Sequence, residues 1–459
     1  MSRSSTPLAD LWTLAEQPPE ALRLCRLVDG PAAFASSFAI DSAAQTSIAA
    51  AALAASELGH LRGAPRQRIT VNSRHAALEA SGWFTLDGHA PELWDDVSGL
   101  YRCRDGHVRL HANFPHHREG ALRLLGVSPL DGIRADAEAA LGTWSAFEFE
   151  DAAAERGLVA AAVRSFDAWD ASPQGTAVAA QPVMTIERIG DADPLPLPSL
   201  AHDDRPLSGL RVLDLTRILA GPTGGRLLAA FGADVMLVNS PQLPNIAAIA
   251  ETSRGKRSAH LDLNLAGDRN TLWRLIKDAH VFVQAYRPGA LAGRGFSPCQ
   301  VAGCRPGIVQ ASLSAYGTRG PWADRRGFDS LVQAAMGFND AEGAAFGEHA
   351  PRALPVQILD QCSGFLIAFG VAAALRRQQT EGGSWHVQVS LAQTAQWLRG
   401  LPRCDPADFL AVADMQACIE TSASGFGLLR AVRPSAQFEH TPARHARASV
   451  PPGTDDAAW

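Results

Sequence analysis

The sequence predicts an α/β protein in which a large domain with a doubly wound, Rossmann-like parallel sheet is joined to a smaller α+β domain. After residue 208, short apolar runs typical of buried strands alternate with stretches of helical spacing, and this alternation builds parallel sheets with ligand sites at the strand carboxyl ends. Before residue 190, DGHVRLHANF alternates like a half-buried strand, and EFEDAAAERGLVAAAVRSFDAW has helical spacing. One strand and helix pattern also occurs twice, which indicates permutation or partial duplication of one domain.

Composition excludes several classes of protein. The 459 residues suggest two or three domains, and 46% hydrophobic residues are ordinary for a globular chain. The 41 basic and 47 acidic residues leave a formal charge of −6, so no general attraction to nucleic acid or anionic membranes is expected. The start has no apolar core of signal-peptide length, and no later segment offers the roughly 20 uninterrupted apolar residues of a membrane helix. We expect a cytoplasmic protein.

Cysteine and histidine spacing does not favour a metal. Seven cysteines are scattered without a CxxC pair, which indicates reduced, mostly structural thiols. LHANFPHHR brings His111, His116 and His117 together, but no second ligand set follows at a recognised spacing. We therefore expect packing or surface histidines and no metal.

The chain divides at the proline-rich stretch 191–207, DADPLPLPSLAHDDRPL, which is typical of an extended linker. It separates an N-terminal region, 1–190, from the large domain, 208–400, and residues 401–459 form a C-terminal arm. The large domain opens with a predicted βαβ unit. Its parts are LRVLDLT as a strand, AGPTGG as a tight turn, GRLLAAF as a helix and ADVMLVN as a second strand. The alternation continues through RSAHLDL, DRNTLWRLIKDA, HVFVQAY, GIVQASLS and FDSLVQAAMGF.

Two aspartates head similar helices. FAIDSAAQTSIAAAALAASEL around Asp41 parallels QILDQCSGFLIAFGVAAALRR around Asp360. About thirty residues after each comes a further similar pair, RITVNSRHAAL and WHVQVSLAQTA. The sequence therefore predicts a duplicated half-motif.

AGPTGG lies where a nucleotide phosphate often binds, between a strand and a helix. It lacks the G-x-G-x-x-G order, and Asn239 ends the second strand where a dinucleotide site would often place an acid. A dinucleotide site is not favoured, because a tight turn with proline at the helix start explains the residues almost as well.

Basic residues precede or follow two strands. Arg254, Lys256 and Arg257 lie in SRGKRSAHLDL, and Arg287 lies in YRPGAL. They could face phosphates, or they could belong to solvated loops.

Asp360 follows a short apolar run and precedes a long helix. As a helix N-cap, its carboxylate would accept backbone hydrogen bonds. As a nucleophile, it would be kept ionised by the helix N-terminus and would attack a thioester carbonyl, with Gly364 leaving room for close approach. Position alone favours the cap.

Five ordered segments resemble the class III (CaiB/BaiF) CoA-transferases. They are PLSGLRVLDLTRILAGPTGGRLLAAFGADVMLV, RGKRSAHLDL, AYRPGALAGRGF, SLSAYGTRGPWADRRGFDSLVQAAMG and ILDQCSGFLIAFGVAAAL. The resemblance covers Arg205 to about Gly400. The N-terminal part looks similar to the family's small domain and VPPGTDD to its closing segment, so the chain order looks permuted.

The resemblance implies a CoA-transferase that uses coenzyme A as substrate, moves it from an acyl-CoA to a carboxylic acid, and needs no metal. Asp360 would be the nucleophile and would pass through aspartyl anhydride and thioester intermediates. The family also implies an interlocked homodimer. The implied contacts to CoA and the acyl approach are Ala220, Leu261, Asn264, Tyr286, Arg287, Arg294, Tyr316 and Gly317.

Departures from the family keep other interpretations open. Phe328 stands where related α-methylacyl-CoA racemases have a histidine, so racemisation is disfavoured. Asn239 and Ser240 replace an acid and a base at the second strand, and Leu219 replaces the glutamine of formyl-CoA transferases. A non-catalytic CoA-binding or assembly partner and a racemase-like enzyme are the alternatives. Asp41, without a glycine four residues on, is interpreted as a structural relic.

Overall fold

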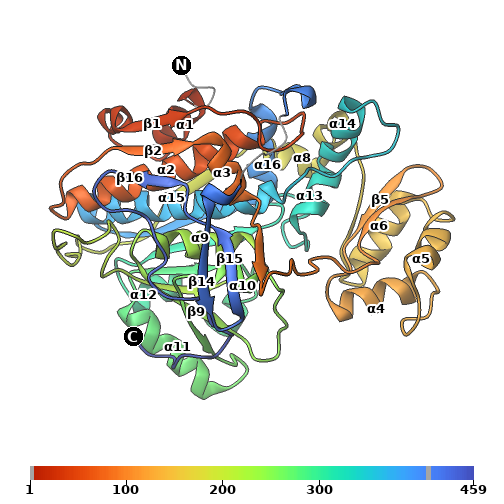
Figure 1. Cartoon of the computed structure of the whole chain (residues 1–459). Coiled ribbons are helices and arrows are strands. Elements are labelled where there is room, and N and C mark those ends of the chain that lie inside the picture. The colour runs from red at the N-terminus through yellow and green to blue at the C-terminus, as the bar shows by residue number, and fades with distance from the viewer. Residues whose placement is uncertain (1–4, 410–414) are drawn as a thin grey trace.

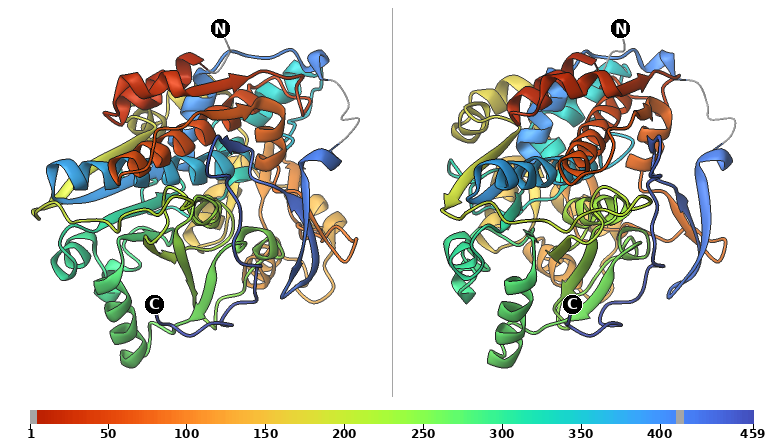
Figure 2. Two further views of the ribbon diagram at one scale, coloured as in Figure 1. Left: turned by 60° about the vertical axis from the view of Figure 1, so that its left-hand side comes forward. Right: turned by 90° about the vertical axis from the view of Figure 1, so that its left-hand side faces the viewer.

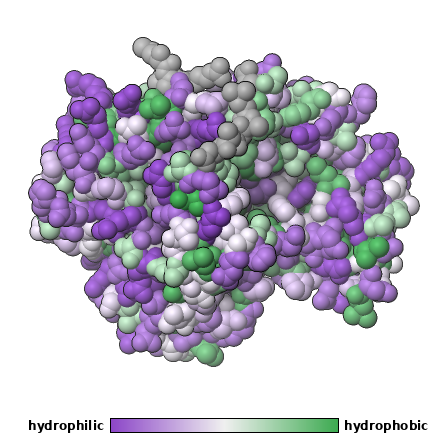
Figure 3. Space-filling view, in the orientation of Figure 1, coloured by the Kyte–Doolittle hydropathy of each residue, from purple (hydrophilic) through white to green (hydrophobic). Residues whose placement is uncertain are grey.

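The computed structural model describes residues 5–409 and 415–459; residues 410–414 of the predicted C-terminal arm lie outside them. A mixed α/β body holds most elements, and a smaller lobe with α4, α5, α6 and β5 lies at the right in Figure 1. The outline of the molecule is notched where the lobe meets the body (Figure 3). The expected pairing of a larger α/β unit with a smaller α+β unit is therefore present.

A seven-stranded sheet organises the body. Its strand order is β10-β9-β8-β11-β12-β13-β7, with β7 antiparallel to β13 and all other neighbours parallel. The strands are β7 (Met184–Gly190), β8 (Arg211–Leu215), β9 (Asp234–Asn239), β10 (Arg257–His260), β11 (Val281–Gln284), β12 (Val309–Ser314) and β13 (Ser384–Ser390). The order reverses beside β8 and β11, which is the place where open α/β sheets bind ligands.

Helices cover both faces of this sheet. On β8, Val212 belongs to the core shared with α9 (Ala220–Ala230) and α15 (Ile358–Glu381), whereas Leu213 packs on the other face with α11 (Ala266–Asp278). Successive strand residues point to opposite faces, so an apolar run such as that of β8 is buried on both sides. The expected strands at 210–216 and 233–239 are confirmed.

The predicted repeat is confirmed by strand pairing. β1 (Cys25–Val28), α2 (Ile40–Leu61), β2 (Ile69–Asn72) and α3 (Ser73–Ala80) follow the same course as β12, α15, β13 and α16 (Leu391–Gly400). In each copy the two strands are parallel, and the second strand pairs with an antiparallel edge strand, β16 (Ala436–Phe438) or β7. The long helices α2 and α15 pack against each other (Figures 1 and 2).

The lobe has its own core. Its sheet β4-β5-β6 consists of β4 (Gly99–Arg102), β5 (His107–Leu110) and β6 (Ala160–Ala162), covered by α4 (Pro115–Leu124), α5 (Arg134–Leu141) and α6 (Ala146–Glu155). The single helix expected around 148–169 is wrong. Gly157 takes φ +68, which ends α6, and the chain forms β6 before α7 (Phe166–Asp170).

The remaining elements connect distant parts of the chain. β14 (Ile419–Ser424) and β15 (Gly427–Val432) form a sheet with β3 (Phe84–Leu86), so the C-terminal residues pair with N-terminal ones. The last residues run past β10 to α11 (Figure 2). There, Trp459 Nε1 donates to Leu275 O. The other helices are α1 (Ser5–Leu14), α8 (Pro173–Ala179), α10 (Ile249–Thr252), α12 (Pro298–Cys304), α13 (Asp329–Ala335) and α14 (Phe338–Ala345). The short 3-10 turns are Pro19–Leu24, Ala292–Arg294, Pro406–Asp408 and Gln416–Cys418.

Helix α15 is long and apolar enough to cross a membrane by length and composition alone. Within the protein, however, 94% of its apolar window is buried, as in the central helix of a packed core.

Gly364 holds α15 against α9. A Cβ atom built on Gly364 would lie 2.5 Å from Ala220 O and 2.8 Å from Thr223 Cβ. The glycine serves helix packing here, whereas the sequence suggested room for a substrate.

We expect Gly364→Ala to lower the free energy of unfolding by about 1–3 kcal/mol, measured by denaturant unfolding. Gly267→Ala on α11 is the matched control: nothing lies within 4 Å of its Cβ, and we expect it to be neutral or slightly stabilising. Equal stability of the two variants would contradict the close-packing argument.

Candidate active site

Asp360 lies in the first turn of α15 and does not cap it. The helix begins at Ile358, its N-cap residue is Gln357, and no side chain of the helix's own N-cap accepts a hydrogen bond there. The N-cap interpretation is therefore wrong, because the helix starts two residues before the aspartate. Among the described residues, no hydrogen bond to the Asp360 carboxylate is found, and the residue is half-buried. Its oxygens are thus available for chemistry.

Asp329 performs the capping role from another helix. The carboxylate of Asp329, at the start of α13, accepts the N–H of Asp360 at 2.9 Å, and Gln333 Nε2 donates to its other oxygen. Asp329 is fully buried. The bond from α15 to Asp329 fixes the first turn of α15 and places two carboxyl groups side by side.

The two carboxyl groups disfavour each other's ionisation. Burial, and then the charge of Asp329, raise the pKa of Asp360 well above its usual range. Burial also raises the pKa of Asp329 to about 6, although the N–H groups of Asp360 and Leu359, the Gln333 amide and the Arg109 charge lower it. The sequence-based expectation that the helix N-terminus keeps Asp360 ionised is thus opposed by burial and the neighbouring acid. Asp329 has the hydrogen-bond donors and the Asp360 carboxylate has none among the described residues, so burial and the neighbouring charge disfavour ionisation more at Asp360.

Removing the Asp329 charge is expected to shift a pH profile. An ionised Asp360 is the nucleophilic form, so activity should rise with pH through the upper pKa of the pair. In Asp329→Asn the neighbouring negative charge is gone, the pKa of Asp360 falls, and the acidic limb of kcat/KM moves to lower pH. A pH series of initial rates measures the limb, with thermal unfolding as the check on folding. An unmoved limb would show that the two groups do not interact.

The predicted CoA residues gather along the carboxyl edge of the sheet. Ala220 begins α9 after β8, and its carbonyl faces Gly364, one turn along α15 from Asp360. Leu261 follows β10 and is buried, and Asn264 Oδ1 accepts from Arg294 Nη2 at 3.4 Å. This hydrogen bond connects the loop after β10 to the segment after β11.

The turn after β11 is the more basic part of that edge. Tyr286 is half-buried and its phenol interacts with the charges of Arg217 and Arg294. Arg287 and Arg294 are exposed, as a phosphate-binding role requires. Arg217, in the loop between β8 and α9, was missed by sequence reasoning. Its Nε is buried without a hydrogen-bond partner, while Nη2 donates to Pro244 O.

Tyr316 and Gly317 follow β12 at the same edge. Tyr316 is 2% exposed, with its ring edge-on to Trp322, so its side chain packs beneath the 325–327 loop. Gly317 has φ +88, a conformation that favours glycine, and it is also buried. Both residues thus support the loop that leads to Phe328 and Asp329.

The basic cluster before β10 is neutralised within the protein. Lys256 Nζ lies 2.9 Å from Asp214 Oδ2, and both side chains are fully buried. Arg254 pairs with Glu251 and Glu420. The solvated-loop and phosphate interpretations are therefore both wrong for these two residues, because each has a buried partner.

Arg257 is likewise paired, because its Nη2 lies 2.5 Å from Asp234 Oδ2.

The glycine-rich segment AGPTGG forms the first turns of α9 and not a tight turn. The strained residue comes earlier, since Ile218 has φ +77. Asn239 is buried, and its Nδ2 donates to Thr216 O.

Asp41 occupies the equivalent place in the repeat, but no acid is among the groups that shift its pKa in the described part of the chain. Its Oδ2 accepts the N–H of Ala33 at 2.8 Å. Burial raises its pKa to about 6, while Ala33 and Arg74 lower it. The Asp41 carboxylate therefore takes part in local structure, and its interpretation as a structural relic stays a prediction.

The histidine cluster packs against the site. His111 stacks on Phe328, with ring centroids 4.0 Å apart and 8° between planes, and His117 Nε2 lies 3.3 Å from Arg326 Nη1. Among residues 5–409 and 415–459, no group of three or more His, Cys, Asp or Glu residues could hold a metal ion. The sequence missed Asp329 and the stacking of His111 on Phe328, although Asp329 directly follows Phe328 in the chain.

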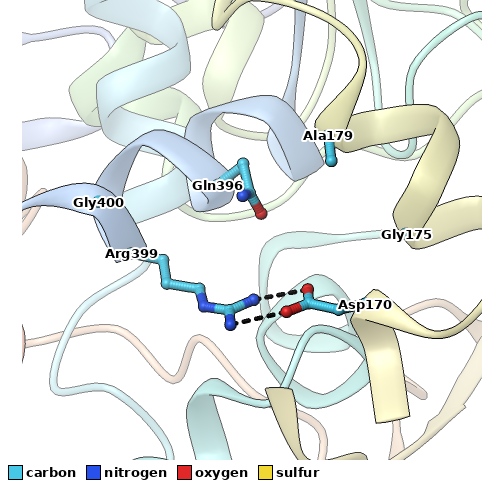
Figure 4. Close-up of a pocket in the computed structure, with 6 residues that line it drawn as sticks. All are labelled: Asp170, Gly175, Ala179, Gln396, Arg399 and Gly400. Atoms are coloured by element: carbon cyan, nitrogen blue, oxygen red, sulfur yellow. Dashed lines mark hydrogen bonds and ion pairs between the residues drawn. The ribbon is translucent and has the colours of Figure 1, made fainter. Parts of the chain in front are cut away.

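Two surface pockets lie elsewhere. The larger of the two has a volume of about 320 Å³. In it, Arg399 and Asp170 form a bidentate ion pair opposite Gln396, with Nη1–Oδ1 and Nη2–Oδ2 distances of 2.7 and 2.8 Å (Figure 4). The second, of about 210 Å³, lies between β5 and α14 and is lined by His107 and Asp340 among others. Neither is lined by Asp360 or Asp329, so the carboxyl pair is a candidate site because of its geometry and not because of a cavity.

Comparison with known proteins gives a consistent family. Residues 207–413 match the model of CoA-transferase family III. An acyl-CoA transferase of Gibberella moniliformis is 30% identical over 379 residues, covering 73% of this chain and 66% of the relative. An acetyl-coenzyme A transferase of Hypoxylon pulicicidum is 37% identical over 199 residues, covering 42% and 34%. The probable fatty acyl-CoA transferase Rv3272 of Mycobacterium tuberculosis is 34% identical over 205 residues, covering 42% and 52%.

The chain thus spans between about a third and two thirds of the length of these curated relatives. Among solved structures, one of Rv3272 is 33% identical, covers 43% of this chain and 57% of its own, and has a TM-score of 0.40. A CAIB/BAIF family protein from Brucella suis is 25% identical, covers 49% and 65%, and has a TM-score of 0.39.

Proposed function

Because the chain belongs to CoA-transferase family III through residues 207–413, we propose that it transfers coenzyme A from an acyl-CoA to a carboxylic acid, with Asp360 as the nucleophile. The observation that supports this most directly is that the Asp360 carboxylate has no hydrogen-bond partner within residues 5–409 and 415–459, while Asp329 caps α15 in its place. A carboxylate free of structural hydrogen bonds can attack a carbonyl.

The proposed reaction proceeds in four balanced steps. An Asp360 carboxylate oxygen attacks the thioester carbonyl carbon, the carbon–sulfur bond breaks, and an aspartyl anhydride and CoA thiolate form. The thiolate attacks the Asp360 carbonyl carbon and releases the first acid. The acceptor carboxylate then attacks the aspartyl thioester and releases the thiolate, and the thiolate attacks the new anhydride to give the product acyl-CoA and free Asp360. Each step replaces one activated acyl bond by another, which keeps the barriers low.

We place CoA along the carboxyl edge of the sheet. Exposed Arg287 and Arg294 would face its phosphates, and Ala220 at the start of α9 would lie near the thioester. The other predicted contacts to CoA and to the acyl group stay part of the proposal: Leu261, Asn264, Tyr286, Tyr316 and Gly317. Asn239 and Ser240 alter the end of β9, so contacts there are expected to be weaker than in other members.

The order of the chain segments, the domain boundaries and the oligomeric state are part of the same proposal. The strand order fits a Rossmann-like sheet in a permuted chain, since β7, from before the 191–207 linker, completes the sheet formed by 208–400. The boundaries 1–190, 191–207, 208–400 and 401–459 stay predictions. We also propose an interlocked homodimer that works in the cytoplasm.

The test is chemical trapping of the intermediate. The protein is incubated with a panel of acyl-CoA esters and then with hydroxylamine, and peptides are analysed by mass spectrometry. We expect a hydroxamate at Asp360 with at least one ester, and none at Asp41, which supplies the internal control. An absence of modification at Asp360 with every ester that the protein binds would favour the non-catalytic CoA-binding alternative.

A further inference from the structure

An arginine of the lobe, Arg109, interacts with the charge of Asp329 and forms no hydrogen bond or ion pair among the described residues. Arg109 lies on β5, whose even-numbered residues Val108 and Leu110 fill the core of the lobe. Side chains alternate along a strand, so Arg109 and His111 point to the other face, and β5 packs there against α13. The charge of Arg109 interacts with that of Asp329, on α13.

The Arg109 guanidinium lies over an aromatic ring but forms no ion pair with a carboxylate among the described residues. Its Nε is buried, and among the described residues it has no hydrogen-bond or ion-pair partner. The guanidinium carbon lies 4.8 Å from the centre of the Trp94 ring. Arg134 is a like-charged neighbour, and the described contacts of Arg134 are backbone carbonyls, such as Ser98 O, and the Tyr101 ring.

The neighbouring His111 adds no charge that could balance Arg109. Burial lowers the pKa of His111 to about 3, so its ring is neutral near pH 7, and its Nδ1 is buried without a partner. The ring lies flat on Phe328, directly before Asp329. Among the residues that the structure describes, the region between β5 and α13 therefore contains the Arg109 cation without a hydrogen-bonded or ion-paired anion, neutral rings and the Asp329–Asp360 pair. A buried polar group without a partner is costly unless a ligand satisfies it.

We propose that Arg109 binds the carboxylate of the acceptor acid and positions it against Asp360. This inference rests on the proposed function, because the acceptor is the second substrate of that reaction. A guanidinium has forked donors that match a carboxylate. It holds one carboxylate oxygen while the other attacks the aspartyl thioester. The lobe thus selects the acceptor, while the sheet edge binds CoA.

The experiment separates the two half-reactions. Arg109→Gln, Arg109→Lys and wild type are compared for loading of Asp360 with CoA from an acyl-CoA, without acceptor, and for the KM of each substrate in full turnover. For Arg109→Gln we expect loading within about twofold of wild type and an acceptor KM raised about tenfold or more. Arg109→Lys keeps the charge but loses the fork, so its acceptor KM should rise by a smaller factor.

Arg102→Gln is the matched control, because Arg102 is exposed on β4 and points to the same side of the sheet, opposite His107. We expect it to change neither KM. An unchanged acceptor KM in both Arg109 variants overturns the inference, and so does an equal rise in the KM of acyl-CoA, which would assign Arg109 to the donor. If wild type does not load Asp360 at all, the proposed function fails and not the assignment of Arg109 alone. Unfolding midpoints of each variant show that the measured changes do not arise from misfolding.

Discussion

Asp360→Ala is expected to lose transferase activity by about 10³-fold or more, because every proposed covalent step passes through this carboxylate. The substitution removes a side chain for which no hydrogen bond is found among the described residues, whereas the backbone N–H that binds Asp329 remains. The fold should therefore persist while the chemistry stops. Steady-state transfer between an acyl-CoA and an acid identified by the trapping screen measures the effect.

Asp41→Ala is the matched control for that loss. It occupies the same place at the start of α2, but its carboxylate accepts a hydrogen bond from Ala33 and has no acidic neighbour of the Asp329 kind among the described residues. We expect kcat to stay within about threefold of wild type, with a modest loss of stability from the unpaired N–H. Comparable activity losses in both variants would point to a shared structural role of the two helices and against Asp360 as nucleophile.

Lys256→Met is expected to have the largest effect on stability. Lys256 and Asp214 are fully buried, and Lys256 Nζ also donates to Pro222 O at 2.8 Å, near the start of α9. Removing one partner leaves the Asp214 charge buried, for which the loss of unfolding free energy is about 3–5 kcal/mol. Denaturant unfolding measures it, with Lys277→Met, at an exposed lysine of α11, as the control expected to change little.

A double variant tests the physical reason for that loss. In Asp214→Asn/Lys256→Met neither charge remains, so the double variant should be more stable than Lys256→Met alone. Additive losses from the two substitutions would mean that packing around the side chains, and not an uncompensated charge, dominates the effect.

Local patterns were sufficient for the sheet and the repeat. The apolar run of β8 and the matched segments around Asp41 and Asp360 predicted strands, helices and a duplicated half-motif, and strand pairing confirms them. These features depend on residues close in sequence, where periodicity reflects burial. Local patterns failed at two boundaries. AGPTGG enters α9, because packing overrides the turn preference of a short segment. Helix α6 ends at Glu155, because Gly157 takes a positive φ that helical periodicity does not reveal.

The sequence by itself determined which carboxylate to consider and the sheet on which it lies. The tertiary structure alone decided the state of that carboxylate. Asp329 takes over the capping of α15 and raises the pKa of Asp360, Lys256 is paired inside the core, and Arg109 reaches the site from another sheet. Desolvation and interactions between charges depend on distances in space. These groups are far apart in the chain, so no local pattern of residues could contain that information.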